Sequence, residues 1–482
     1  MDTRVKSELL KDRAYINGQW VAAKNSFKVI NPANGEVVAE VADLDRSQVA
    51  EAIAAAEAAF PSWAALTAKA RSEILRRWAE LMLDNVDELA AILTSEMGKP
   101  LAEAKVEIAY GASFITWFSE EARRIYGDTI PGHMPDKRIL VLKQPIGVAA
   151  SITPWNFPNA MIARKVAPAL AAGCTFVGRP SELTPLSALA MAELGERAGI
   201  PAGVLNIVPS LDAAGIGQEF CENPAIRKIS FTGSTRVGQI LMAQAAPQIK
   251  KISLELGGNA PFIVFDDADI DAAVEGAIIA KFRNAGQTCV CANRIYAQDG
   301  IHDEFVEKLT KRVAELRVGD GSVPGTEIGP MINDAALAKV EQHLDDAVKN
   351  GATITTGGVR DESGALFFKP TVLSGATKDM LLALEETFGP VAAVFRFDTE
   401  EEVIRLANDT EFGLASYFYA RDMSLIIRVM EKLESGMVGV NTGLISTAEA
   451  PFGGVKMSGL GREGSKYGID DYLELKYVCL SI

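Results

Sequence analysis

The chain has 482 residues, 48% of them apolar and 23% charged, which is typical of a folded globular protein with two or three domains. Its 48 basic and 63 acidic residues give a net charge of −15, which argues against a nucleic-acid partner. The N-terminus lacks an apolar centre, and nowhere do about 18 apolar residues follow one another, so neither export nor membrane spanning is predicted and we expect a cytoplasmic protein.

The cysteine and histidine content limits the possible chemistry. The five cysteines are odd in number and lack CxxC spacing, so neither a disulfide framework nor a structural zinc site is predicted. The three histidines, His133, His302 and His343, lie beside no plausible nucleophile motif. We therefore expect no metal site and no serine-hydrolase triad.

The pattern of elements changes along the chain. Helical periodicity dominates residues 47–120, and branched apolar strands begin after Gly127. Between Pro158 and Lys251, short apolar runs alternate with alanine-rich helical stretches, which indicates βαβ units on a parallel sheet. The alternation resumes after Gly257 and predicts a second α/β unit, with the main domain boundary near residues 256–259.

Two segments contain candidate catalytic groups. FRNAGQTCVCANR places Cys289 in a polar, glycine-containing turn, where exposed nucleophiles tend to lie, although a buried and inert cysteine is the common alternative. KKISLELGGN places Glu255 at the end of a predicted strand between two leucines. Partial desolvation there raises a carboxyl pKa and suits a general base, the alternative being a solvated glutamate.

A third segment, SFTGST, follows a predicted strand and precedes a helix. Small residues and free backbone N–H groups at a helix start can hold a pyrophosphate, although a plain turn would have the same sequence. No GxGxxG fingerprint is present, so an ordinary Rossmann site is not predicted.

Taken together, six strings resemble the aldehyde dehydrogenase superfamily in order and spacing: SITPWNFP, FTGST, LELGGN, GQTCVCANR, EETFGP and APFGGVKMSGLGREGSKYG. The resemblance runs the length of the chain, and within the superfamily the sequence is most similar to bacterial succinate-semialdehyde dehydrogenases. It implies an α/β fold with a parallel-sheet dinucleotide-binding domain (1–126 and 145–256), an α/β catalytic domain (257–460) and a small β oligomerisation segment (127–144 and 468–482). A homodimer or homotetramer is thereby implied.

The resemblance implies a covalent mechanism for a small-molecule aldehyde. Cys289 would attack the aldehyde, Asn156 and the Cys289 backbone N–H would hold the oxyanion, and Glu255 would activate the water that hydrolyses the thioester. Succinate semialdehyde is the expected substrate, and glutarate semialdehyde is an alternative because one methylene leaves no signature in the sequence. Arg164, Arg283 and Ser446 would hold the distal carboxylate, unless Arg164 lies on a surface helix and Arg283 pairs with a local acid.

The implied cofactor is NAD, with NADP possible. Glu182 would bind both ribose hydroxyls and repel a 2′-phosphate, whereas Arg179 could pair with that phosphate. The segment GRPSE departs here from the lysine-containing segment usual in the family. The residues expected to contact the cofactor are Thr153, Pro154, Trp155, Arg179, Ser181, Glu182, Gly215, Phe231, Gly233, Ser234, Leu256, Glu386 and Phe388.

Cys291 lies two residues after the expected nucleophile, and the resemblance suggests a reversible disulfide between Cys289 and Cys291. Residues i and i+2 of an extended strand are about 6.5 Å apart, so the backbone would have to bend, and a simple packing role is the alternative.

Three other functions are considered: a cofactor-independent cysteine hydrolase, a non-catalytic relative, and a reductase of an acyl phosphate or acyl-CoA. The hydrolase leaves FTGST and EETFGP without a role, and the presence of Asn156, Glu255 and Cys289 argues against the other two.

Overall fold

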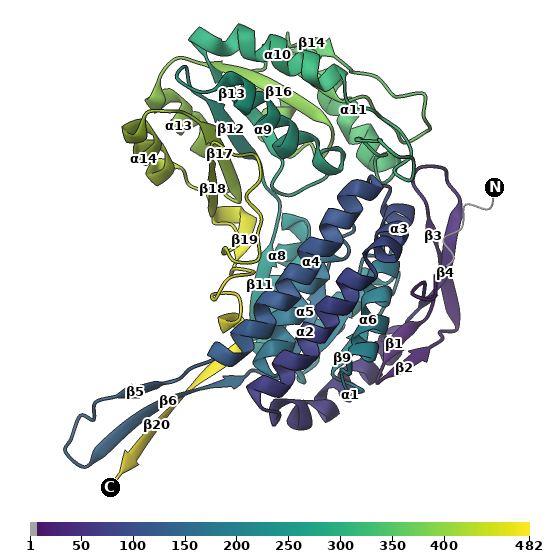
Figure 1. Ribbon diagram of the computed structural model, residues 1–482, viewed down its shortest axis with the longest axis vertical. Coiled ribbons are helices and arrows are strands. Elements are labelled where there is room, and N and C mark those ends of the chain that lie inside the picture. The colour runs from purple at the N-terminus through teal and green to yellow at the C-terminus, as the bar shows by residue number, and fades with distance from the viewer. Residues whose placement is uncertain (1–6) are drawn as a thin grey trace.

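Of the helices predicted for residues 47–120, α2 (Ala68–Asp84), α3 (Val86–Met97) and α4 (Leu101–Glu121) form a layer in front of the first sheet (Figure 1). Most of the buried residues of α1 (Arg46–Ala64) instead pack with those of α7 (Ala213–Glu222). The structure, a computed structural model, describes residues 7–482. Asp45 accepts a hydrogen bond from the Gln48 N–H and so starts the first helix, and Gly98, at a φ of 88°, ends the third.

The first sheet has eight strands in the order β19-β11-β10-β7-β8-β9-β1-β2, and its central strands are parallel. These central strands are β7 (Val148–Ile152), β8 (Thr175–Arg179), β9 (Leu205–Ile207), β10 (Ile226–Thr232) and β11 (Lys251–Glu255). They alternate with α5 (Ala160–Ala172), α6 (Leu186–Ala198), α7 (Ala213–Glu222) and α8 (Thr235–Ala245). The βαβ arrangement predicted from the sequence is present.

The edges of this sheet come from distant parts of the chain. β1 (Ala14–Ile16) and β2 (Gln19–Val21) extend one edge, and β19 (Gly459–Leu460) pairs antiparallel with β11 at the other. β3 (Asn25–Ile30) and β4 (Val37–Asp43) form a separate two-stranded sheet. The sequence analysis did not predict the four N-terminal strands.

The second sheet has seven strands in the order β14-β15-β16-β13-β12-β17-β18. Its strands are β12 (Ala260–Val264), β13 (Ala292–Gln298), β14 (Thr353–Thr356), β15 (Thr371–Ser374), β16 (Val391–Phe397), β17 (Ala415–Tyr419) and β18 (Met437–Val440). Its helices are α9 (Ile270–Phe282), α10 (His302–Ala314), α11 (Asp334–Lys349), α12 (Leu381–Leu384), α13 (Glu400–Asn408) and α14 (Met423–Lys432). The chain passes from the first sheet to the second within residues 256–259.

A three-stranded ribbon projects from the body of the molecule (Figure 1). Its strands are β5 (Asp128–Ile130), β6 (Lys137–Pro145) and β20 (Leu473–Ser481), and β20 pairs with β6 along all nine residues. The ribbon exposes apolar side chains, including Leu475 (70% exposed) and Tyr477 (61% exposed). Within residues 7–482, none of the helices combines the length and apolar character needed to cross a bilayer.

Candidate active site

Cys289 lies in a turn between α9 and β13. The preceding 3-10 turn, Arg283–Gly286, holds Asn284 and Ala285 at a φ of 54° each, in the left-handed region that costs energy for residues other than glycine. Gln287 secures the turn, because its side-chain amide donates to the carbonyls of Asn284 (3.1 Å) and Pro330 (3.2 Å). These bonds hold the nucleophile loop in its unusual conformation.

A cavity of ≈ 570 Å³ lies beside this turn. Cys289, Arg164, Arg283 and Ser446 all line it, so the structure brings together the predicted nucleophile and the three predicted substrate residues. The remaining wall is largely apolar and includes Tyr110, Phe157, Met161, Ile278, Phe282, Leu444 and Phe452. Three acidic residues, Glu103, Glu107 and Glu327, also line the cavity, so it suits a short chain with an apolar middle whose negatively charged end lies at the two arginines.

The thiol of Cys289 is neutral at rest. Burial raises its pKa to about 12, although the nearby arginines Arg164 and Arg283 oppose that effect. A group that accepts the thiol proton is therefore needed before the sulfur can attack a carbonyl.

Asn156 brings its amide to the nucleophile loop. It lies in the turn after β7 and is 4% exposed. Its Nδ2 donates to the carbonyl of Gln287 at 3.0 Å, two residues before Cys289. The Asn156 Oδ1 has no hydrogen-bond partner among the described residues. Asn156 itself does not line the 570 Å³ cavity, so it lies beside the nucleophile loop with its amide bonded to that loop.

Glu255 ends β11 and is 3% exposed. Burial raises the pKa of its carboxyl well above the usual range, and the neighbouring carboxylate of Glu463 raises it further. Glu255 does not line the 570 Å³ cavity. A role as base toward Cys289 therefore requires its side chain to turn toward the cavity.

Glu463 belongs to a buried cluster that the sequence analysis missed. It pairs with the Nε of Arg164 at 2.7 Å and with the Nζ of Lys165, which also donates to the hydroxyl of Thr232 at 2.6 Å. Although burial opposes it, Lys165 and Arg164 lower the pKa of Glu463. Glu463 reaches this place because β19, which ends three residues earlier, pairs with β11 at the edge of the first sheet, and Glu463 also bridges to Phe452.

The two cavity arginines have different surroundings. Arg164 is not on a surface helix: it is 1% exposed, pairs with Glu463 and lies over the Phe452 ring at 3.8 Å. Arg283 lies over the Phe157 ring at 5.4 Å, and no residue among 7–482 forms an ion pair with it. Arg283 therefore retains the greater capacity for a negatively charged ligand.

The comparisons with known proteins agree with this geometry. A family model described as "Aldehyde dehydrogenase family" matches residues 20–478. The chain belongs to the aldehyde dehydrogenase family. It is 62% identical to a glutarate-semialdehyde dehydrogenase of Pseudomonas putida and 59% identical to the NADP(+) succinate-semialdehyde dehydrogenase of Escherichia coli, with 99% of each chain covered in both cases. A solved structure of succinate-semialdehyde dehydrogenase from Burkholderia pseudomallei superposes with a TM-score of 0.98 at 59% identity, covering 99% of this chain and 100% of that one.

These comparisons confirm the predicted family and fold class. In this aldehyde dehydrogenase, most of the residues expected to hold the cofactor lie along the carboxyl edge of the first sheet, whereas Glu386 and Phe388 lie between α12 and β16 of the second unit. Thr153, Pro154 and Trp155 follow β7, Phe231 lies near the end of β10, Leu256 follows β11, and Gly215 lies in the first turn of α7. That edge is where parallel α/β sheets bind their ligands.

The residues at this edge fit a dinucleotide. Gly233 and Ser234 lead into α8, where Ser234 accepts from the Val237 N–H at 3.4 Å and the first-turn N–H groups can face a phosphate. At the nicotinamide end, the rings of Trp155 and Phe388 meet edge to face with their centroids 5.7 Å apart. Glu386 accepts from the Gly258 N–H at 3.4 Å, and burial raises its pKa to about 7.

The adenosine end contains an arginine that already has a partner. Arg179 ends β8, and its Nη2 donates to the Glu182 carboxylate at 2.8 Å and to the Ser210 carbonyl at 2.8 Å. Ser181 lies between them, and its hydroxyl accepts from the Leu183 N–H at 3.3 Å. The Gly215 N–H donates to the Asp212 carboxylate and thereby caps α7.

Cys291 is separated from the cavity. The backbone at Cys289 is a turn and not an extended strand, because the Cys291 N–H donates to the Thr288 carbonyl at 3.1 Å. Cys291 is 5% exposed, its sulfur lies 3.3 Å from the Nζ of Lys281, and both Cys289 and Cys291 are free thiols.

Proposed function

We propose that this aldehyde dehydrogenase oxidises an acidic semialdehyde, with succinate semialdehyde as the first candidate, to the corresponding acid. One observation supports this most strongly: Cys289 shares a largely apolar cavity with Arg164, Arg283 and Ser446. An aldehyde carbon at the sulfur and a carboxylate at the guanidinium groups would use both ends of that cavity. Arginine suits this role because its planar fork matches a carboxylate.

The residues of the chain divide the chemistry between them. Glu255, after turning toward the cavity, takes the thiol proton of Cys289 and passes it to solvent. The sulfur then adds to the aldehyde carbon, and the Asn156 amide stabilises the oxyanion of the thiohemiacetal, a contribution of about 3 kcal/mol for one such donor. A nicotinamide dinucleotide held by residues such as Trp155, Ser234 and Glu386 would supply the hydride acceptor needed to oxidise this cysteine adduct to a thioester. Glu255, after turning toward Cys289, takes a proton from the water that hydrolyses the thioester.

Glutarate semialdehyde is the second candidate substrate. The cavity of ≈ 570 Å³ has room for one further methylene, and the Pseudomonas putida relative at 62% identity carries that name. A methylene contributes only about 1 to 3 kcal/mol to discrimination in an apolar pocket. We therefore expect both semialdehydes to be oxidised, and measured initial rates will give the ratio of their kcat/KM values.

For the cofactor we propose NAD in preference to NADP. The ion pair between Glu182 and Arg179 leaves a carboxylate near the ribose and uses the arginine nitrogen that would otherwise meet a 2′-phosphate. The Escherichia coli relative is named as an NADP(+) enzyme. The proposal therefore predicts that this chain differs from that relative in its preferred cofactor.

We further propose that the protein is a cytoplasmic homodimer or homotetramer. The projecting ribbon of β5, β6 and β20 exposes Leu475, Tyr477 and Ile482, which a partner subunit would cover. Light scattering after gel filtration would give the mass, and a monomer at micromolar concentration would contradict the proposal.

The deciding experiment measures initial rates of nicotinamide reduction with succinate semialdehyde, glutarate semialdehyde and neutral butanal, each with NAD and with NADP. We expect kcat/KM for the acidic aldehydes to exceed that for butanal by about 100-fold, the effect of an ion pair in a closed site. Equal rates on all three would refute the carboxylate site while leaving the family chemistry intact. Cleavage of an ester in the absence of nicotinamide, together with no nicotinamide reduction by any of the three aldehydes, would instead favour the cysteine hydrolase.

A further inference from the structure

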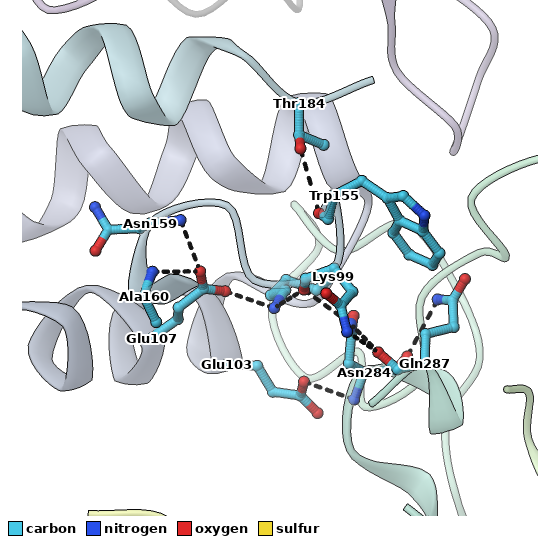
Figure 2. Close-up of polar contacts among 10 residues, drawn as sticks. Lys99, Glu103, Glu107, Trp155, Asn159, Ala160, Thr184, Asn284 and Gln287 are labelled. Atoms are coloured by element: carbon cyan, nitrogen blue, oxygen red, sulfur yellow. Dashed lines mark hydrogen bonds and ion pairs between the residues drawn. The ribbon is translucent and has the colours of Figure 1, made fainter. Parts of the chain in front are cut away.

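Charged side chains gather at the start of α4, where neither the fold nor the mechanism described so far requires them. Lys99 lies two residues before the helix, and Glu103 and Glu107 lie on its first two turns (Figure 2). The side chains of Lys99 and Glu107 are 0% and 1% exposed, and their Nζ and Oε2 atoms are 2.6 Å apart. An ion pair this deeply buried is costly to desolvate, so it adds little to stability by itself.

Glu107 caps the helix that follows Asn156. Its Oε1 accepts hydrogen bonds from the backbone N–H groups of Asn159 (3.0 Å) and Ala160 (3.2 Å), at the start of α5. A carboxylate at a helix N-terminus satisfies donors that have no partner within the helix. The contact fixes the backbone on the C-terminal side of Asn156.

Lys99 holds the backbone at Asn156 itself. Its Nζ donates to the Asn156 carbonyl at 2.8 Å and lies over the Phe157 ring at 3.7 Å. Phe157 lines the reaction cavity, and Asn156 directly precedes it in the chain. Figure 2 shows Lys99 between the Glu107 carboxylate and the turn that follows β7.

The same helix also holds the nucleophile loop. The Glu103 carboxylate accepts from the Asn284 N–H at 2.9 Å, within the left-handed turn before Cys289. The Asn284 side chain in turn donates to the carbonyls of Asn156 (3.1 Å) and Gln287 (3.2 Å). The start of α4 is thus bonded both to the turn of Asn156 and to the loop of Cys289.

We propose that Lys99 and Glu107 are positioning residues, whose buried ion pair fixes the Asn156 amide relative to Cys289 so that it meets the developing oxyanion. The proposal rests on the function proposed above. An oxyanion donor is effective only when it is already in place, because reorganisation during the reaction consumes the stabilisation it supplies. A misplacement of about 1 Å can cost about 100-fold in rate.

Glu96 provides an internal control. It is also fully buried, and its carboxylate accepts from the N–H groups of Leu186 (2.7 Å) and Ser187 (2.8 Å) at the start of α6. Helix α6 follows the turn of Arg179 and Glu182, which is expected to meet the adenosine, whereas α5 follows Asn156. The same kind of cap therefore supports a different part of the site, and its loss should affect cofactor binding and not the oxyanion.

The test is a double-mutant cycle on turnover. Lys99→Met is introduced into the native chain and into an Asn156→Ala variant, and kcat, KM and melting temperature are measured for each. In the native background we expect kcat to fall about 10- to 100-fold with KM for the aldehyde changed less than about threefold. In the Asn156→Ala background the same substitution should cost less than about twofold, because the amide on which Lys99 acts is gone.

Equal losses of kcat in the two backgrounds would overturn the proposal, since they would show that Lys99 acts independently of Asn156. Glu96→Gln is the matched control, for which we expect a raised KM for the nicotinamide cofactor, little change in kcat and the same effect in both backgrounds. Alkylation of Cys289 by iodoacetamide should keep its rate in the Lys99→Met variant, since the attack of the thiol on that reagent needs no oxyanion donor.

A gentler variant protects the test against misfolding. Glu107→Gln keeps an oxygen for Lys99 or for the α5 N–H groups but removes the charge, so a smaller loss of kcat with the same dependence on Asn156 is expected. Additivity with Asn156→Ala would again refute the proposal. The cycle uses whichever aldehyde the native enzyme oxidises fastest. An error in the proposed substrate therefore appears in the native substrate preference, whereas an error in the positioning role appears only in the cycle.

Discussion

The two ends of the active site use arginine in different ways. In the substrate cavity, Arg283 lies over an aromatic ring and forms no ion pair with residues 7–482. At the adenosine turn, Arg179 is bonded to Glu182 and to the Ser210 carbonyl. The presence of an arginine therefore does not by itself indicate an anion site. What decides is whether a nearby carboxylate already neutralises the guanidinium.

Arg164 is intermediate between these two cases. It lines the cavity, and its Nη2 has no hydrogen-bond partner among the described residues, yet its Nε pairs with Glu463. Arg164 can therefore contribute one nitrogen to a substrate while its charge also holds the buried cluster around Glu463. Substitutions at the three arginines should have effects of three different kinds.

The largest effect is expected at Arg283. Because this guanidinium forms no ion pair with the described residues, Arg283→Met should lower kcat/KM for succinate semialdehyde by about 100-fold or more and leave that for butanal within about twofold. Initial rates with both aldehydes test this. A matched loss on butanal would mean that Arg283 shapes the loop of Cys289 and does not select the substrate.

Arg164→Met should act on stability as well as on rate. Removing Arg164 leaves Lys165 as the only cation paired with the buried Glu463 carboxylate among the described residues, which should lower the free energy of unfolding by up to about 3 kcal/mol. Both aldehydes should be affected, in contrast to Arg283→Met. Denaturant unfolding measures the loss. An unchanged stability would show that the ion pair does not form in solution.

The cluster around Arg164 also predicts a pH effect. Burial and then Glu463 raise the pKa of Glu255, so at low pH this carboxyl is protonated and cannot take a proton from water. Hydrolysis of the thioester should therefore slow as pH falls through that raised pKa. Glu463→Gln removes the like charge and should move the acidic limb of kcat down by about one pH unit. An upward shift, or none, would mean that another group controls the limb.

Sequence patterns predicted the parts of the fold that depend on local order. The alternation of apolar runs and alanine-rich stretches marks β7 to β13 and their helices, because strands and helices have different periods. The N-terminal strands β1 and β2 have three residues each, too short for a period to show. The pairing of β19 with β11 joins segments about 200 residues apart, which no local pattern contains.

The candidate site shows the same limit. The motif resemblance supplied Cys289, Asn156 and Glu255, and the structure places the first two on adjoining loops. It did not indicate Glu463, which lies 299 residues from its partner Arg164. Nor did it indicate Lys99 and Glu107, because charged residues near the start of a helix normally face solvent and their spacing does not reveal burial. Only tertiary packing decides which charges are enclosed.

The smallest predicted effect concerns the adenosine turn, where the arginine is already paired. Glu182→Gln removes a carboxylate that would repel a 2′-phosphate and frees Arg179 to meet it, while the amide oxygen can still accept from a ribose hydroxyl. We expect kcat/KM with NADP to rise about tenfold and that with NAD to fall by less than about threefold. The added change Arg179→Met should abolish the gain with NADP, because the gain depends on the released guanidinium. If the gain persisted without Arg179, relief of repulsion alone would explain it, and the difference between a paired and an unpaired arginine would not govern this end of the site.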